Sequence, residues 1–213
     1  MKWTNGIIRA MIWSLFLCTF ILSAQSQKED YWISYIDSLS GNELYGYKNR
    51  AGEIKIVAKY IIIGTDTLHT AAFVLSNNKW VMIDKQEKVL LEPFIYDNGP
   101  DYTVEGLFRY VENNKIGFAN EKGEKVIPAQ FDFAFYFSEG LAAFSVGGEK
   151  VMDSGGEHWF WGGGTWGYVN AKGKIVIPPK YDYAHEFRDG TAEVQLNGEG
   201  VQIDKKGNVL KSQ

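Results

Sequence analysis

Carboxylates recur at fixed places in this chain, and paired carboxylates could do acid–base chemistry. Asp132 and Asp182 each follow an aromatic residue, and Glu139 and Asp189 each precede a glycine. Glycoside hydrolysis uses two such groups, one as the acid and the other as base or nucleophile. All four, however, keep the same position within a repeated segment, whereas a catalytic residue needs to be present only once. We therefore predict that these carboxylates form turns and that none is catalytic.

A second group with chemical potential is an aromatic run at residues 147–164, GGEKVMDSGGEHWFWGGG. Exposed aromatic clusters mark interaction sites, and flat rings stack on sugar rings or on peptide aromatics. The candidate ligand-binding residues are Glu157, His158, Trp159, Phe160 and Trp161. Two interpretations stay open: the rings are exposed to a ligand, or an elongated hairpin pairs residues 150–153 with 158–161 and covers the core with one aromatic face. A hydrolase using Asp153 or Glu157 with His158 is a further hypothesis.

The sequence predicts no metal and no cofactor. Its three histidines are His69, His158 and His185, and no two share the spacing of metal ligands. The sequence also has no glycine-rich phosphate loop that opens a helix, and no nucleophile motif.

The first 26 residues are predicted to be a signal peptide. Lys2 and Arg9 form a positive segment, and residues 10–22 are an uncharged apolar run. That run is shorter than the roughly 20 residues that span a bilayer, and small residues follow it, so we place cleavage after Ser26. A lipid anchor at Cys18 is the alternative, disfavoured by the bulky residues before it.

Export would fix the composition of the mature chain, residues 27–213. Cys18 is the single cysteine, so cleavage would remove every thiol and exclude disulfides and cysteine chemistry. It would leave 20 Lys and Arg against 26 Asp and Glu, a formal net charge of −6. Because nucleic-acid affinity comes mainly from neutralising phosphates, no nucleic-acid partner is expected. No later apolar run is long enough to span a membrane. We expect a periplasmic or extracellular protein whose partner is a protein or a glycan.

The architecture follows from an internal repeat. Residues 116–142 and 166–192 are identical at 12 of 27 positions, and related segments begin at five sites spaced 35, 36, 50 and 34 residues apart. The five copies start at Tyr45, Trp80, Ile116, Trp166 and Gly200. The fifth position is always Asn or Asp, and the eighth is Gly except at Glu87.

This Asn/Asp and Gly pair predicts a β-hairpin. Asn or Asp opens a turn through its side chain, and Gly closes it in the left-handed region. A non-glycine residue there should cost roughly 1 kcal/mol, so the sequence alone predicts that Glu87→Gly raises the melting temperature. A proline then follows the second strand, as at Pro128 and Pro178, and is predicted to end it.

A third strand follows a second turn and ends at residue pairs such as Asn77-Asn78, which suit tight two-residue hairpins. Residues 27–213 are therefore predicted to be all-β: tandem repeats of about 35 residues, each with roughly three antiparallel strands, in an open solenoid-like β-meander. A propeller-like closed array is the alternative. Residues 31–36 are expected to form a leading strand that caps the N-terminal end. The copy from Gly200 would cap the other end, and residues 147–164 are an insertion at a hairpin tip.

The motif resembles the WG-repeat family, which is mostly bacterial. The residues that carry the resemblance are WGYVNAKGKIVIPPKYDYA from Trp166, followed by FRDGTA from Phe187. It extends from Tyr45 to Leu210 and is strongest in the copies at Ile116 and Trp166. The resemblance implies all-β tandem repeats without a defined catalytic residue set, hence a non-enzymatic interaction module. A structural spacer is the alternative.

Overall fold

The computed structural model describes residues 30–38, 41 and 43–210, and the signal-peptide prediction for residues 1–26 lies outside them. Contacts divide the chain into two units, residues 1–31 and 32–213. The fold described below is that of the second unit.

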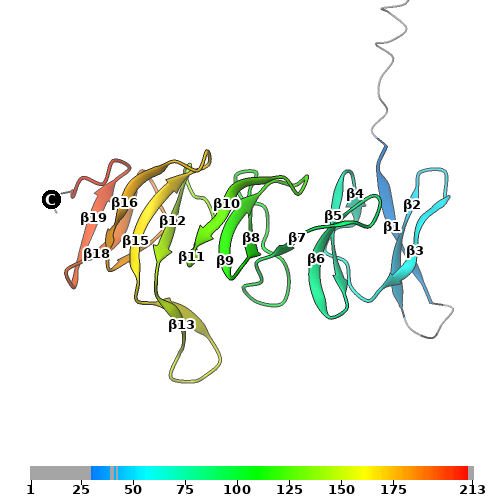
Figure 1. Cartoon of the computed structure of the whole chain (residues 1–213), viewed down its shortest axis with the longest axis horizontal. Helices are drawn as coiled ribbons and strands as arrows, with labels where there is room; N and C mark the ends of the chain where they lie inside the picture. Colours follow the sequence, from blue (N-terminus) through cyan, green and yellow to red (C-terminus); the bar gives the residue numbers. More distant parts are fainter. Residues whose placement is uncertain (1–29, 39–40, 42, 211–213) are drawn as a thin grey trace, which may run out of the picture. The chain divides into compact units, whose positions relative to one another are not determined.

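The second unit is all-β, as predicted, and its described residues contain no helix. Figure 1 shows its antiparallel sheets following one another in chain order, and none is closed into a barrel. The strands are β1 (Trp32–Asp37), β2 (Leu44–Asn49), β3 (Ile54–Tyr60), β4 (Thr67–Leu68), β5 (Ala71–Ser76), β6 (Lys79–Asp84), β7 (Val89–Pro93), β8 (Phe108–Glu112), β9 (Lys115–Ala119), β10 (Lys125–Phe131), β11 (Phe133–Ala134), β12 (Leu141–Val146), β13 (Glu149–Met152), β14 (Trp159–Gly162), β15 (Thr165–Asn170), β16 (Ile175–Tyr181), β17 (Tyr183–Ala184), β18 (Thr191–Leu196) and β19 (Glu199–Asp204).

Each group of three strands joins the third strand of one repeat to the hairpin of the next, and the second and third groups form one six-stranded sheet. The recurring triplets are β1-β2-β3, β5-β6-β7, β8-β9-β10 and β12-β15-β16, and β18-β19 ends the series. This is the open β-meander that the repeat predicts. The expected leading strand is β1, which pairs with β2 along its whole length.

The hairpin turns form as the motif predicts. In all five copies the side-chain oxygen of the Asn or Asp accepts backbone N–H groups two and four residues later, and Asn170 does so from Lys172 and Lys174 at 3.0 Å each. The eighth residue has a positive φ, 78° at Gly173 and 61° at Glu87. The two-residue turns are confirmed as well, with φ of 50° and 61° at Asn77 and Asn78.

The recurrent carboxylates link turns to one another. Glu105 accepts the backbone N–H of Gly140 at 2.9 Å, and Glu139 accepts that of Gly190, one repeat further, at 3.0 Å. Asp182 accepts the N–H of Gly198 at 2.9 Å at a two-residue turn. These carboxylates hold turns together, as the repeated positions predict.

The prediction that proline ends the second strand is wrong. β16 continues through Pro178 and Pro179 to Tyr181, and β10 continues through Pro128 in the same way. The register shifts between the pairs Tyr168–Ile177 and Trp166–Tyr181, which marks a β-bulge. The bulge takes the prolines out of the hydrogen-bonding ladder, so no donor is missed there.

The glycine of the Trp-Gly motif makes room for this bulge. A Cβ atom on Gly167 would lie 2.5 Å from the carbonyl oxygen of Ile177 and 2.8 Å from the nitrogen of Pro179. At Gly46 and Gly117 the equivalent backbone atoms would lie 2.5–2.7 Å away. Real Cβ atoms do not approach backbone this closely, so the position requires glycine wherever the bulge crosses it.

The residue opposite each of these glycines is Tyr where the bulge contains an alanine with a free N–H group, and Phe where the bulge contains a proline at that position. Tyr35 and Tyr110 lie opposite Gly46 and Gly117, and their hydroxyl oxygens accept the backbone N–H of Ala58 and Ala129, each at 3.0 Å. The third repeat pair has Phe144 opposite Gly167, where the bulge residue is Pro179 and has no N–H to donate. A hydroxyl is thus present only where a donor faces it.

This pairing predicts the outcome of a double-mutant cycle. Phe144→Tyr should destabilise the fold by about 1–2 kcal/mol, because Phe144 is buried and the new hydroxyl would meet a proline. Adding Pro179→Ala should recover most of that loss by restoring the N–H donor. Chemical denaturation of the four proteins measures the coupling, and additive effects would contradict the pairing.

The structure changes the expectation for Glu87→Gly. The turn is as predicted, but the Glu87 carboxylate also accepts a hydrogen bond from the Tyr60 hydroxyl at 3.0 Å and pairs with Lys59, both from the preceding sheet. Burial, and next this hydrogen bond, raise the pKa of Tyr60 well above its ordinary value. The copy that starts at Ile116 has Phe131 in the position of Tyr60. Phe131 has no hydroxyl group to donate, and the turn of the next copy carries Gly173 in the position of Glu87.

We therefore expect Glu87→Gly alone to leave the melting temperature nearly unchanged, because the relief of roughly 1 kcal/mol of strain is offset by the lost hydrogen bond. In a Tyr60→Phe background the same change should raise the melting temperature by about 2–4 °C. Thermal unfolding followed by circular dichroism tests both. A lower melting temperature for the double variant than for Tyr60→Phe would contradict the explanation.

Candidate functional site

The insertion forms the elongated hairpin that was one of the two interpretations. β13 and β14 pair from Glu149–Gly162 to Met152–Trp159, and the backbone N–H of Asp153 donates to the carbonyl of His158 at 2.8 Å. In Figure 1 this hairpin projects from the side of the repeats, below β12 and β15. The hairpin replaces the two-residue turn of the other repeats, since Val146 and Thr165 pair at its base.

Alternation along β14 separates the candidate residues onto different faces. Trp159 and Trp161 share one face and pack, half-buried, against the main core. Trp161 stacks on Phe133 with 5.3 Å between ring centroids and a 10° interplanar angle, and its indole N–H donates to the Gly147 carbonyl at 3.0 Å. One aromatic face of the hairpin thus covers the core.

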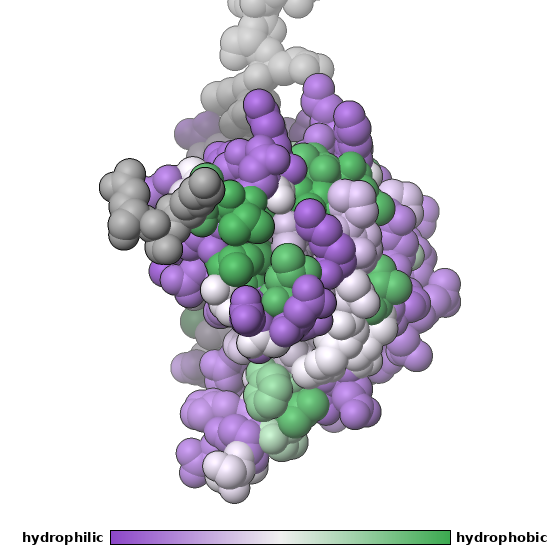
Figure 2. Space-filling model, turned by 90° about the vertical axis from the view of Figure 1, so that its left-hand side faces the viewer, coloured by the Kyte–Doolittle hydropathy of each residue, from purple (hydrophilic) through white to green (hydrophobic). Residues whose placement is uncertain are grey.

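The remaining candidates are exposed. Phe160 lies on the opposite face of β14 and is 50% exposed, while Glu157 and His158 lie exposed at the tip. The lower protrusion in Figure 2, which corresponds to this hairpin, carries apolar side chains toward its base and hydrophilic ones at its end. The structure brings Trp159 and Trp161 together and separates them from the other three residues.

A second departure from the repeat meets the hairpin. The N–H of Phe94 donates to the carbonyl of Arg109 as that of Phe135 does to Ala143, so residues 95–104 stand where another repeat has only 136–138. This longer loop carries Tyr96, whose ring lies 4.9 Å from that of Trp159. The ring of Phe94 lies 6.4 Å from Trp159 in an edge contact. We call Phe94, Tyr96, Phe133, Trp159 and Trp161 the aromatic platform.

Sequence reasoning did not find the half of the platform that comes from this loop. The copies at Trp80 and Ile116 are 36 residues apart, which is close to the common spacing. The spacing hides the longer loop because the second strand of this repeat is shorter, and the two changes in length nearly offset each other. The usable signal was local: Pro93 is followed by FIYDNGPDY, in which Tyr96-Asp97 is followed by Asn98 instead of a second aromatic residue.

A buried ion pair fixes the long loop beneath the platform. The Arg109 guanidinium makes two hydrogen bonds to the Asp101 carboxylate, at 2.5 and 2.8 Å, and donates a third to the Ala134 carbonyl at 2.8 Å. Its side chain is 5% exposed, and its Cζ atom lies 4.4 Å from the centroid of the Phe94 ring. Because every face of the guanidinium is occupied, its role is to hold the loop and the rings in place.

Charges surround the platform. The Lys150 ammonium lies 4.7 Å from the centroid of the Trp159 ring, which is a cation–π contact. The carboxylate of Asp132 anchors the base of the hairpin by accepting the N–H of Gly147 at 2.8 Å and pairing with Lys115 at 2.5 Å. The hydrogen bond from Lys115, followed by that from Gly147, lowers the pKa of Asp132 below its ordinary value.

This shift predicts a pH-dependent anchor. A carboxyl group whose pKa is lower in the folded state stabilises the fold above its unfolded-state pKa near 4, and the contribution is lost as pH falls through the folded-state pKa. We expect Asp132→Asn to lower the melting temperature by about 3 °C at pH 7 and by progressively less below pH 4. Thermal unfolding of both proteins from pH 7 to 3 measures this. A difference that stays constant with pH would exclude the Asp132 charge as its cause.

Within residues 30–38, 41 and 43–210, no three or more His, Cys, Asp and Glu side chains are grouped as a metal ion would require. The same part of the chain has no helix with the length and hydrophobicity to cross a membrane.

The fold and the platform define a tandem β-repeat protein with an aromatic surface built at two departures from the repeat. Residues 82–115, 116–149 and 166–199 each match the family described as WG containing repeat, and the chain is a WG-repeat protein. The copies at Tyr45 and Gly200 lie outside the matched segments. Comparison with curated proteins and with solved structures gave no match.

Proposed function

We propose that this WG-repeat protein is a non-enzymatic interaction module that binds a protein partner through the aromatic platform and the adjoining hairpin. The observation that carries the proposal is that two separate departures from the repeat meet at Tyr96 and Trp159. The repeat itself requires neither of them, since the other hairpins close with two-residue turns and the loop of the next repeat has only residues 136–138.

The surroundings of the platform favour a protein partner. Tyr96 is 49% exposed, and the hairpin beside it carries Phe160, which is 50% exposed, together with the charged residues Lys150, Asp153 and Glu157. Aromatic residues within a polar rim are typical of protein interfaces, where Trp and Tyr contribute most of the binding energy. A glycan is the second candidate, because the half-exposed flat ring of Tyr96 can stack on a sugar.

The hydrolase hypothesis receives less support. The Asp153 carboxylate accepts the backbone N–H of Glu157 at 3.1 Å, so it has a turn-forming role at the hairpin tip. Glu157 and His158 are exposed there. Catalytic carboxylates depend on a site that excludes water, and an exposed tip does not provide one.

We further propose that the protein is exported, with residues 1–26 removed. The proposal rests on the positive and apolar N-terminal sequence and on the absence of cysteine from residues 27–213. N-terminal sequencing of the protein recovered from outside the cytoplasm tests it. A mature chain that still begins at Met1 would contradict it.

Site-specific crosslinking tests the binding surface. A photoreactive phenylalanine analogue would replace Tyr96 or Phe160 in producing cells, with the same replacement at Ile36 of β1 as a matched control that is 51% exposed. We expect one discrete adduct from Tyr96, which belongs to the platform, and the same adduct from Phe160 of the adjoining hairpin, with none from Ile36. A protease-sensitive adduct indicates a protein, and a glycosidase-sensitive one indicates a glycan. Identical adducts at all three positions, or none at the platform, would refute the proposed site.

A further inference from the structure

The triplet β5-β6-β7 lacks part of a strand that the other triplets contain. In those three triplets the second strand crosses its bulge and pairs again at an aromatic residue: Tyr60, Phe131 and Tyr181 pair with Tyr45, Ile116 and Trp166. In the triplet β5-β6-β7, β7 pairs with β6 only at Met82 and Ile83. Its end then pairs with β8, Pro93 opposite Tyr110. The first residue of this repeat, Trp80, therefore has no partner strand on that side.

Val81 accompanies this change. It occupies the position of the motif glycine, where a Cβ atom would collide with a crossing bulge. The Val81 side chain would collide with a crossing bulge, and β7 forms none because it leaves β6 and pairs with β8 instead. Where the bulge would lie, the structure has a groove.

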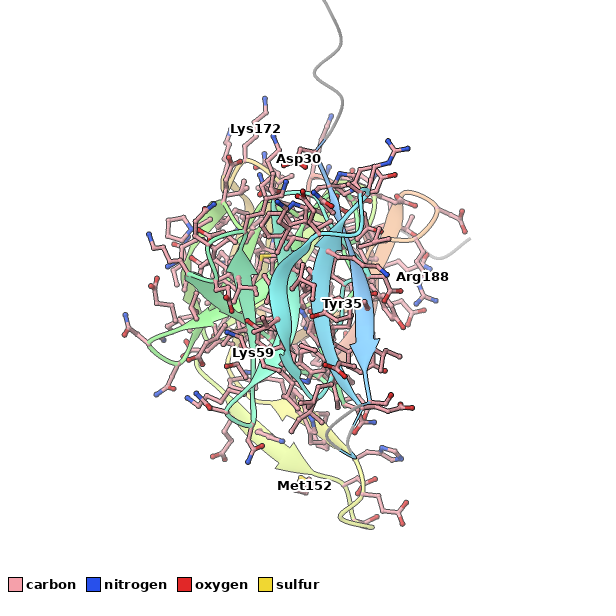
Figure 3. All side chains as sticks on the ribbon, turned by 90° about the vertical axis from the view of Figure 1, so that its right-hand side faces the viewer. Asp30, Tyr35, Lys59, Met152, Lys172 and Arg188 are labelled. Atoms are coloured by element: carbon pink, nitrogen blue, oxygen red, sulfur yellow. The ribbon has the colours of Figure 1, made fainter. Side chains whose placement is uncertain are left out.

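The groove has a volume of about 690 Å³, within the range that holds a small ligand or a few peptide residues. Its lining includes Lys59, Tyr60, Ile61, Val81, Glu87 and Val89. Figure 3 labels Lys59, which lies on β3 at one rim of the groove.

The floor and the rim of the groove differ in exposure and charge. Tyr60, Val81 and Ile83 are buried and form an apolar floor. Ile61 is 61% exposed and Val89 is 53% exposed, so apolar surface at the rim remains in water. The rim charges of Lys59 and Glu87 pair with each other. The groove therefore favours an occupant that is apolar and carries little net charge.

We propose that this groove binds an extended peptide segment of a partner protein, which takes the place of the missing half of the second strand. Addition of a strand to a free sheet edge is a common mode of peptide recognition, in which the main chain supplies affinity and side-chain pockets supply specificity. The chain itself shows which segments fit such a place. They are Ile-Val-Ala-Lys-Tyr at 56–60, Ile-Pro-Ala-Gln-Phe at 127–131 and Ile-Pro-Pro-Lys-Tyr at 177–181.

These three segments define the chemistry of the occupant. Each has an apolar residue, then two residues drawn from Val, Ala and Pro, then a long polar residue and an aromatic one. The aromatic residue would pair beside Trp80, as Tyr181 does beside Trp166. Because Val81 keeps a tight bulge from approaching, the bound segment lies more extended than the intramolecular ones.

A fluorescent peptide with the sequence IVIPPKYDYA, taken from residues 175–184, tests this on the full-length protein. We expect a saturable rise in fluorescence anisotropy that a scrambled peptide does not give. Ile61→Glu and Val89→Glu each place a charge at the apolar rim and should weaken binding by about tenfold or more. Both residues are more than half exposed, so the melting temperature should not change.

Ile54→Glu is the matched control, because Ile54 lies on β3 and is 58% exposed but does not line the groove. It should bind the peptide as the wild type does. Equal binding by wild type, Ile61→Glu and Val89→Glu would show that the peptide binds elsewhere and would overturn the proposal. So would the absence of saturable binding by the wild type, or the same loss in Ile54→Glu.

Discussion

Gly167→Ala is expected to lower the stability of the protein by about 3 kcal/mol, which corresponds to a fall in melting temperature of roughly 6–12 °C. The added Cβ would lie 2.5 Å from the Ile177 carbonyl oxygen and 2.9 Å from the carbonyl carbon of Pro178. These are backbone atoms of a strand that also holds Tyr181 in the core, so the collision cannot be relieved by a side-chain rotation. The second strand must shift and lose its pairing beyond the bulge.

Gly200→Ala provides the matched control. Gly200 lies in β19, has no atom within 4 Å of an added Cβ and does not have a positive φ. Its replacement should change the melting temperature by no more than about 2 °C. Equal effects of the two substitutions would show that the loss at Gly167 reflects glycine in a strand in general, and not the crossing bulge.

Asp101→Asn is expected to destabilise the protein by about 3–5 kcal/mol, because it leaves the Arg109 guanidinium buried without its counter-charge. The two side chains are only 5% and 12% exposed, so water cannot replace the lost carboxylate. The long loop, residues 95–104, would lose its main attachment, and Tyr96 would lose its position beside Trp159.

Denaturant unfolding, with tryptophan fluorescence as the probe, measures this loss. Asp97→Asn is the control, since Asp97 belongs to the same loop and is exposed. Removing both charges, with Arg109→Leu added to Asp101→Asn, should recover part of the stability because no unpaired charge then stays in the core. A double variant less stable than Asp101→Asn would show that the guanidinium stabilises the platform independently of Asp101.

Gly167→Ala and Asp101→Asn are expected to affect binding differently. Gly167→Ala acts on the repeat framework, whereas Asp101→Asn acts on the loop that carries half of the aromatic platform. If the platform binds a partner, Asp101→Asn should reduce crosslinking from position 96 even at temperatures where the protein remains folded.

The sequence predicted the repeats and their turns because these depend on local chemistry. An Asn or Asp side chain that accepts two nearby N–H groups, and a residue with positive φ three positions later, involve one short segment each. Recurrence of the same letters then placed every hairpin. The strand through the prolines was mispredicted because the bulge that accommodates it is made possible by a glycine on the neighbouring strand.

The sequence alone determined the fold class, the hairpin turns, the repeat family and the insertion with its aromatic residues. Only the tertiary structure decided which side chains meet: Glu87 with Tyr60 across two sheets, Arg109 with Asp101 under the rings, and Tyr96 beside Trp159. The physical reason is that turns are set by backbone conformation and hydrogen bonds over a few residues. Packing between successive repeats joins residues that are far apart in the chain, so local patterns do not reveal it. The shortened strand β7, which opens the groove, leaves the spacing between the copies at Trp80 and Ile116 almost unchanged.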